Sequence, residues 1–281
     1  MGNRDTVEHF ERLNRYFNFS RWKYNFFLNG SKHFGYYPDE KWLPTKQAQE
    51  LMQDLVAQKI NLGSGMRVLD AGCGQGVTSA YLAQNYGCFV EGITVVPFEI
   101  QEANRLAKKL RVADHVRYSF MDYSRLEFSD ASFDAVYTQE SLVHALDFRT
   151  AINEFFRVLK KAGSIALFEY SMAEDSKFSP KELRTMREMS HASAMHSFPE
   201  MRHSILETLM SEVGFRNVKI ENISRKVVPM LKQYEKFVKP IYLFFRVLGM
   251  TDRMPNLVAA ARMVEFGEKD LVRYNIYTAQ K

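Results

Sequence analysis

The residues with the clearest chemical pattern form a glycine-rich turn in the first third of the chain. Residues 68–76 read VLDAGCGQG, so a short apolar run ends at Asp70, and glycines follow at Gly72, Gly74 and Gly76. Glycine lets a backbone approach a ligand closely and adopt a positive φ. Asp70 adds a negative charge that would repel a pyrophosphate but attract a cation. The turn therefore predicts a site for a positively charged ligand rather than for a dinucleotide.

Polar and acidic residues follow the next three apolar runs in the same way. After the runs at 89–93, 116–120 and 133–137 come, in order, Thr94, Val95 and Glu99, then Asp122 and Tyr123, then Gln139 and Glu140. A carboxylate at Glu99 could accept both hydroxyls of a ribose. Asp122 could accept from an adenine amino group, with Met121 or Tyr123 against the ring. S-adenosyl-L-methionine carries a sulfonium, an ammonium and an adenosine, and it fits this set.

Three residues are candidates for the chemistry beside that ligand. His144 follows the fourth apolar run, and imidazole suits a base near neutral pH. Glu169 ends the fifth run, where burial would raise its pKa and let it accept a proton. For Glu140 we favour an architectural role or a contact with the cofactor over a role in catalysis. His144 could instead be a helix-surface residue, and Glu169 could make a structural hydrogen bond at the sheet edge.

These residues need a scaffold of strands alternating with helices. Strands are predicted at 67–70, 89–93, 116–120, 133–137 and 164–170, with helices between them, as at 97–110 and 151–159. Further strands are expected at 218–223 and 274–279, after a helix at 207–214. This order predicts an α/β fold, with a Rossmann-like, doubly wound, mostly parallel seven-stranded sheet. Ligands of such sheets bind beyond the carboxyl ends of the strands.

The chain divides into three stretches by sequence pattern. Residues 1–60 read as helices with an aromatic loop at 33–38, and residues 61–170 hold the predicted cofactor-binding core. Residues 171–281 hold the rest of the sheet and two insertions. The first, at 171–205, reads as helices over the sheet edge, and the second, at 227–267, as an irregular apolar stretch. We expect both insertions to form a lid over an apolar acceptor pocket, because they are rich in Met and aromatic residues.

Composition narrows the classes of function. The 281 residues are 46% hydrophobic with a net charge of +5, and the basic residues are scattered. They form no continuous basic track, so nucleic-acid binding is not expected. The two cysteines form no ligand motif, so no metal is expected, and they favour a reducing, cytoplasmic compartment. No apolar run is long enough for an integral membrane segment. A homodimer remains possible.

The motifs together resemble the class I S-adenosylmethionine-dependent methyltransferases. Within them, the sequence is similar to the sterol 24-C-methyltransferase, tocopherol methyltransferase and natural-product methyltransferase group. The resemblance covers about residues 30–170 and rests on the segments 33–37 (HFGYY), 68–76, 92–94 with Pro97, Asp122, 133–134, 140–141 and 157–159 with Gly163. It implies that Tyr36 of the first loop approaches the cofactor. The family often has Gln where this chain has Glu99, and Glu can accept the same hydrogen bonds.

The expected function is methyl transfer from S-adenosyl-L-methionine to a small apolar acceptor. C-methylation of an isoprenoid or sterol-like alkene is favoured, because aromatic faces in the lid can stabilise a carbocation. The alternative is O-methylation of a phenolic or hydroxylated natural product, with His144 or Glu169 as the base. A lipid-modifying synthase at a membrane surface, a methyltransferase for nucleic acid or protein, and a non-catalytic protein that binds the cofactor are further alternatives.

Overall fold

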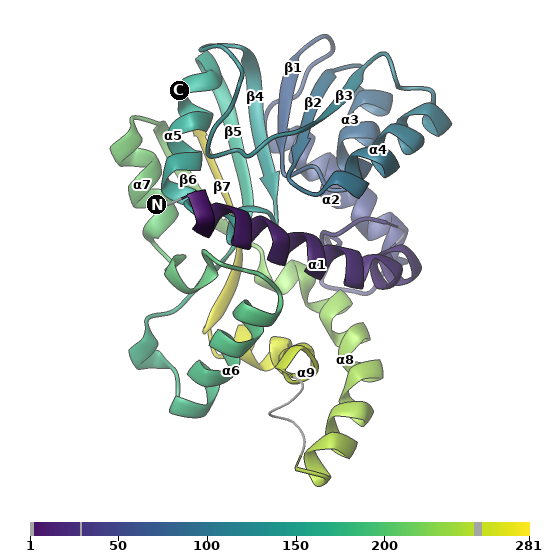
Figure 1. The fold of residues 1–281 in the computed structure, drawn as a ribbon, viewed down its shortest axis with the longest axis vertical. Coiled ribbons are helices and arrows are strands. Elements are labelled where there is room, and N and C mark those ends of the chain that lie inside the picture. The colour runs from purple at the N-terminus through teal and green to yellow at the C-terminus, as the bar shows by residue number, and fades with distance from the viewer. Residues whose placement is uncertain (1–2, 29, 250–254) are drawn as a thin grey trace.

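A seven-stranded sheet forms the centre of the computed structural model, which describes residues 3–28, 30–249 and 255–281 (Figure 1). Its strands are β1 (Arg67–Ala71), β2 (Phe89–Thr94), β3 (Val116–Phe120), β4 (Phe133–Gln139), β5 (Leu159–Met172), β6 (Arg216–Asn222) and β7 (Val272–Gln280). They lie in the order β3-β2-β1-β4-β5-β7-β6. β7 runs antiparallel to both of its neighbours, and the other pairings are parallel. The predicted fold class is confirmed.

Both faces of the sheet are buried along its central strands, which explains why β1, β4 and β5 read as apolar runs, whereas the edge strand β6 is mostly exposed. Successive strand residues point to opposite faces. In β4, Val136 packs with the cluster that holds Phe155, and its neighbours Ala135 and Tyr137 pack with the cluster that holds Met52. Helices on both sides therefore hold the carboxyl ends of the strands in fixed positions.

Helices and short 3-10 turns complete the chain. They are α1 (Asn3–Leu28), α2 (Thr45–Lys59), α3 (Val77–Tyr86), α4 (Pro97–Leu110), η1 (Leu142–His144), α5 (Phe148–Val158), η2 (Asp175–Lys177), α6 (Pro180–Ala192), η3 (Phe198–Glu200), α7 (Ile205–Val213), α8 (Ser224–Val247) and α9 (Pro255–Glu268). In Figure 1, α1 crosses the lower ends of the parallel strands, and α6, α8 and α9 lie below the sheet. This arrangement encloses the space where a ligand of the fold would bind.

The second lid insertion differs from the sequence-based expectation. Residues 227–267 were expected to be irregular, but most of them form α8 and α9, which pack against each other. Pro229 and Pro240 lie inside α8. Each proline removes one backbone donor and usually ends or kinks a helix. Here the helix continues, because its first half buries Val227 and Leu231 against the core.

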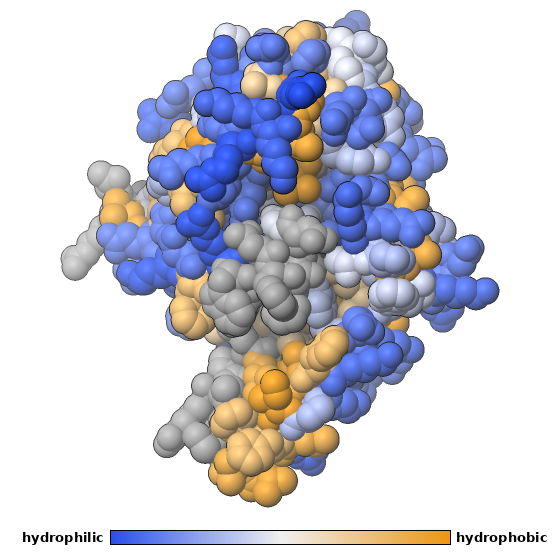
Figure 2. All heavy atoms as spheres, turned by 90° about the vertical axis from the view of Figure 1, so that its right-hand side faces the viewer, coloured by the Kyte–Doolittle hydropathy of each residue, from blue (hydrophilic) through white to orange (hydrophobic). Residues whose placement is uncertain are grey.

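The far half of α8 exposes many apolar side chains. Figure 2, turned to show the right-hand side of Figure 1, shows hydrophobic side chains gathered at the lower end of the molecule. Large apolar side chains of α8 are exposed there, among them Phe237, Ile241 and Phe244. No helix in the described ranges is both long and apolar enough to cross a membrane.

Candidate functional site

A cavity of about 1170 Å³ lies at the carboxyl ends of the strands. Residues of the glycine turn and of the loops after β2, β3 and β4 line one part of it. Residues of α1, α6, α8 and α9 line the rest. The volume exceeds the roughly 300–1,000 Å³ that is typical of a pocket for one small ligand. The cavity therefore has room for two molecules side by side.

The glycine turn brings the backbone to the cavity. Gly72 has φ +98°, and a Cβ there would lie 2.4 Å from Ser141 Cβ, so only glycine fits. Asp70 is buried at the end of β1, where its Oδ2 accepts hydrogen bonds from Ser79 Oγ and from Tyr137 OH at 2.6 Å. Burial raises the pKa of Asp70 to about 6. A cation bound beside it would favour the ionised form.

Glu99 is the predicted ribose partner, and it is held by two groups. Thr94 Oγ1 donates to Glu99 Oε2 at 2.6 Å, and the Lys32 ammonium pairs with Glu99 Oε1. Burial lowers the pKa of Lys32, and the carboxylate of Glu99 opposes that shift. Sequence reasoning missed Lys32, because nothing in its local pattern links it to a residue 67 positions away.

The remaining cofactor candidates line the same part of the cavity. Asp122 accepts from the backbone N–H and the hydroxyl of Ser124, and the Tyr123 hydroxyl donates to Ser141 O at 2.9 Å. Gln139 Oε1 accepts from Thr78 Oγ1 at 2.7 Å. The buried Gln139 Nε2 makes no hydrogen bond within the described part of the chain. A buried donor needs an acceptor, and a carboxylate of a bound ligand would supply one.

Tyr36 is a correction to the expected cofactor set, because it does not line the cavity. Gly35 lies so close to α2 that a Cβ there would be 2.5 Å from Ala48 Cβ. The Tyr36 N–H donates to Ala48 O at 2.8 Å, and the ring of Tyr36 packs against the core. The docked loop instead presents Lys32 and Phe34 to the cavity.

Glu140 lies at the centre of an aromatic group that lines the cavity. Its Oε1 accepts from Phe34 N at 2.7 Å and from Tyr274 OH at 3.0 Å, and its Oε2 accepts from Tyr170 OH. The rings of Phe34, Tyr170 and Tyr274 are mutually 5.1–6.1 Å apart, centroid to centroid. Burial raises the pKa of Glu140 to about 7. The group combines a carboxylate with the electron-rich faces of aromatic rings, and both attract positive charge.

The backbone of Glu140 is strained. Its φ is +54°, which side-chain-bearing residues rarely adopt. The Glu140 N–H donates to Phe168 O at 2.8 Å, and the three bonds to its carboxylate hold the conformation. Strain of this kind concentrates at functional sites, because the surrounding structure must maintain it.

His144 lines the cavity from η1, between the lid and α1. Its Nδ1 lies 3.0 Å from Ala194 O, and a carbonyl can only accept, so Nδ1 carries the proton. In the neutral ring Nε2 then has the lone pair. Burial lowers the pKa of His144 to about 4, so the neutral form prevails at neutral pH. His144 therefore can accept a hydrogen bond from a ligand hydroxyl.

Glu169 is a correction to the expected catalytic set. It is fully buried and does not line the cavity. Its Oε1 accepts from Thr138 Oγ1 at 2.8 Å and from the backbone N–H groups of Ser141 and Leu142 at 3.0 and 2.9 Å. The neighbouring residue Tyr170 faces the cavity instead. Glu169 therefore holds the loop after β4 and positions Glu140.

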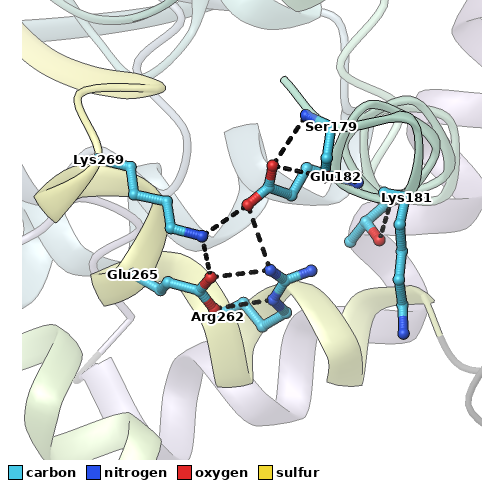
Figure 3. Close-up of polar contacts among 7 residues, drawn as sticks. Ser179, Lys181, Glu182, Arg262, Glu265 and Lys269 are labelled. Atoms are coloured by element: carbon cyan, nitrogen blue, oxygen red, sulfur yellow. Dashed lines mark hydrogen bonds and ion pairs between the residues drawn. The ribbon is translucent and has the colours of Figure 1, made fainter. Parts of the chain in front are cut away.

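The lid is held together by charged residues of α6, of α9 and of the turn just after α9, as Figure 3 shows. Glu182 of α6 accepts from Lys269 Nζ at 2.8 Å and lies 3.5 Å from an Arg262 nitrogen of α9. Glu265 bonds to the same two cations. The bond from Lys269, with bonds from Ser179, lowers the pKa of Glu182 to about 2. This network fixes α6, whose Met186 and Met189 line the cavity. No group of His, Cys, Asp or Glu in the part of the chain described could hold a metal ion.

Comparisons with known proteins find methyltransferases and proteins related to them along most of the chain. Residues 69–167 match a family model described as a methyltransferase domain. The chain is 34% identical to O-methyltransferase resE of Aspergillus sclerotiorum, over 74% of this chain and 77% of that protein. It is 29% identical to the S-adenosyl-L-methionine-dependent Diels-Alderase iccD of Talaromyces variabilis, over 93% of this chain and 91% of that protein. The crystal structure of the [4+2]-cyclase SpnF superposes with a TM-score of 0.72 and 25% identity, over 96% of this chain and 95% of the SpnF chain.

Proposed function

The chain belongs to the S-adenosylmethionine-dependent methyltransferases, and from this premise we propose that it methylates an alkene carbon of a small apolar acceptor, with isoprenoids as the favoured class. The cofactor supplies a sulfonium-bound methyl group and is left as a neutral thioether. The protein must bind and orient the two reactants and stabilise the charge that develops on the acceptor. The observation that carries the proposal is the buried Glu140 carboxylate among the rings of Phe34, Tyr170 and Tyr274.

The chemistry of an alkene acceptor explains why such a group is useful. An alkene that gains a methyl group through a new carbon–carbon bond is left with a positive charge on the neighbouring carbon. The Glu140 carboxylate and the rings of Tyr170 and Tyr274 all line the cavity, and groups of both kinds stabilise such a charge. Loss of a proton from the acceptor restores a double bond. Glu140 can take this proton, because its pKa of about 7 is well matched to proton exchange near neutrality.

The cofactor would occupy the other part of the cavity. We assign Asp70 and the glycine turn to its cationic end, Gln139 Nε2 to its carboxylate, Glu99 to the ribose, and Asp122 with Tyr123 to the adenine. Asp70→Asn should weaken binding of S-adenosylmethionine by at least about tenfold in calorimetry, through loss of a charge facing a cation. Asp134→Asn is the matched control, because Asp134 pairs with Lys160 and does not line the cavity. Equal affinities for the two variants would contradict the assignment.

The acceptor class is tested with isotopically labelled S-adenosylmethionine and a panel of isoprenoid alkenes, phenols and other hydroxylated compounds. We expect the label on a carbon of an alkene, located by mass spectrometry and NMR. Glu140→Gln should lower kcat by roughly a hundredfold while cofactor affinity changes little. Tyr170→Phe should also lower kcat. Tyr81→Phe is its control, since Tyr81 donates to Asp54 outside the cavity. Label on oxygen alone would overturn the proposal.

O-methylation is a second candidate, and the state of His144 favours it. Its Nδ1 donates to Ala194 O, so Nε2 can accept a hydrogen bond from an acceptor hydroxyl and orient it, while the pKa of about 4 makes His144 a weaker base than Glu140. This role predicts that His144→Phe abolishes oxygen methylation, whereas Glu140→Gln leaves most of it. If an alkene acceptor is used and Glu140→Gln abolishes methylation while His144→Phe leaves most of it, the reaction depends on the Glu140 group.

Cycloaddition is a third candidate, because iccD and SpnF each match more than 90% of this chain. A cavity with room for two molecules could hold a folded polyene beside the cofactor. Such a reaction would convert the acceptor with no change in mass and no consumption of S-adenosylmethionine. The labelling experiment separates it directly from both forms of methyl transfer.

A further inference from the structure

The far half of α8 carries an exposed row of apolar side chains. Phe237 is 64% exposed, Ile241 50%, Phe244 61% and Leu248, just beyond the helix end, 53%. Their spacing of four, three and four residues places them on one face of the helix. Single exposed apolar residues are ordinary, but a continuous row indicates an interaction surface. Figure 2 shows this surface at the lower end of the molecule.

Basic residues share the helix with this row. Lys232, Lys236, Lys239 and Arg246 are all exposed and lie, by helical spacing, mostly on the opposite side of the helix. The helix contains a single acidic residue, Glu235, whose half-buried carboxylate accepts from Lys239 at 3.0 Å. Aromatic and aliphatic residues on one side with lysines and arginines on the other are the pattern of helices that lie in a membrane interface.

The same helix reaches the cavity. Phe237, the first residue of the exposed row, lines the cavity together with Tyr234 and Val238. The apolar row is therefore continuous with the cavity wall.

We propose that the far half of α8 docks on the surface of an anionic lipid bilayer. Ile241, Phe244 and Leu248 enter the boundary between headgroups and acyl chains, and the lysines on the other side of the helix stay in the aqueous layer and attract the acidic headgroups. Phe237 then lies at the point where the cavity meets the lipid. An apolar acceptor dissolved in the bilayer enters the cavity along this face, and this last clause rests on the proposed function.

The test is co-sedimentation of the full chain with vesicles, without cofactor or acceptor. Vesicles of phosphatidylcholine are compared with vesicles of phosphatidylcholine and phosphatidylserine. We expect strong preference for the second kind. Lys232→Gln/Lys236→Gln/Lys239→Gln should weaken binding to them by about a hundredfold, because each lysine near an anionic surface contributes roughly fivefold. Ile241→Ser/Phe244→Ser should weaken it by at least about tenfold.

Controls remove the same kinds of side chain elsewhere. Lys108→Gln/Lys109→Gln/Lys161→Gln removes three exposed lysines and the same net charge, and Phe89→Ser/Phe120→Ser removes two exposed aromatic rings. These variants should bind vesicles as the parent does. Equal binding by the α8 variants and the controls would overturn the proposal, as would indifference of the parent to phosphatidylserine.

Two further measurements separate this proposal from the others. If sedimentation equilibrium shows a dimer that Ile241→Ser/Phe244→Ser converts to a monomer, a second copy covers the face and the proposal falls. The α8 variants should keep their activity on a detergent-dispersed acceptor. Vesicle binding that follows the predicted order, in a protein that methylates no alkene, would retain the docking surface and reject the proposed acceptor.

Discussion

Replacing Gly72 with alanine should destabilise the protein more than the same change at two other glycines with positive φ. Gly65, Gly72 and Gly74 have φ values of +77°, +98° and +53°. An L-residue in this region costs about 1–2 kcal/mol, and all three variants share that cost. The three variants differ in the space that is available for the added methyl group. A Cβ at Gly72 would lie 2.4 Å from Ser141 Cβ, whereas at Gly74 the nearest atom is 3.8 Å away and at Gly65 nothing lies within 4 Å.

Ser141 cannot easily move away from the added methyl group. Its Oγ donates to Ala71 O at 2.7 Å, and its N–H donates to Glu169 Oε1 at 3.0 Å. Overpacking of a fixed site costs about 1–3 kcal/mol. We therefore expect Gly72→Ala to lower the free energy of unfolding by about 2–5 kcal/mol, against about 1–2 kcal/mol for Gly65→Ala and Gly74→Ala.

Urea unfolding of the cofactor-free protein measures these differences, and calorimetry should show about 2–4 °C in Tm for each kcal/mol. Ser141→Gly tests the cause, because it removes both clashing atoms. In a double-mutant cycle, Gly72→Ala should cost less in the Ser141→Gly background than in the parent. If Gly72→Ala is no less stable than Gly65→Ala, contact with Ser141 is not the reason that the turn requires glycine.

Three other predictions concern charge. Burial raises the pKa of Glu140 to about 7, so a reaction that needs its carboxylate should speed up as pH rises through that value, and Glu140→Gln should lose this dependence. If the variant keeps the same pH profile, the pH dependence of the rate belongs to another group. Burial lowers the pKa of His33 from 6.5 to about 4, so stability should be intact above pH 6.5 and decline toward pH 4. Full protonation costs roughly 3 kcal/mol, and urea unfolding of His33→Gln should show a smaller decline. Glu182→Gln breaks the ion pairs between α6 and α9 and should cost about 1 kcal/mol and raise KM for the acceptor. An unchanged KM would show that the network does not hold the lid in place.

Much of the site was predictable because its signals are local. The glycine turn, with Asp70 at its start, lies within residues 68–76, and its glycines permit the positive φ values that the turn adopts. Glu99, Asp122 and Gln139 follow successive strands, and a parallel sheet gathers such residues at one edge. All four side chains line the cavity. The lid helices α8 and α9 were less predictable, because two prolines masked a helix that tertiary packing maintains.

Glu169 and Tyr170 show what the sequence alone could not decide. Adjacent strand residues point to opposite faces, and both residue types suit a catalytic site. Only the packed sheet determines that Tyr170 faces the cavity while Glu169 holds the loop beneath it.

By itself, the sequence determined the order of the strands, the glycine turn and the acids around it, because each depends on short-range spacing and residue chemistry. Tertiary structure decided which distant groups meet these acids. Lys32 reaches Glu99, and Tyr274 reaches Glu140 across 134 residues. Such pairings depend on how the loops and the last strand pack together, and no local pattern in a single sequence encodes that arrangement.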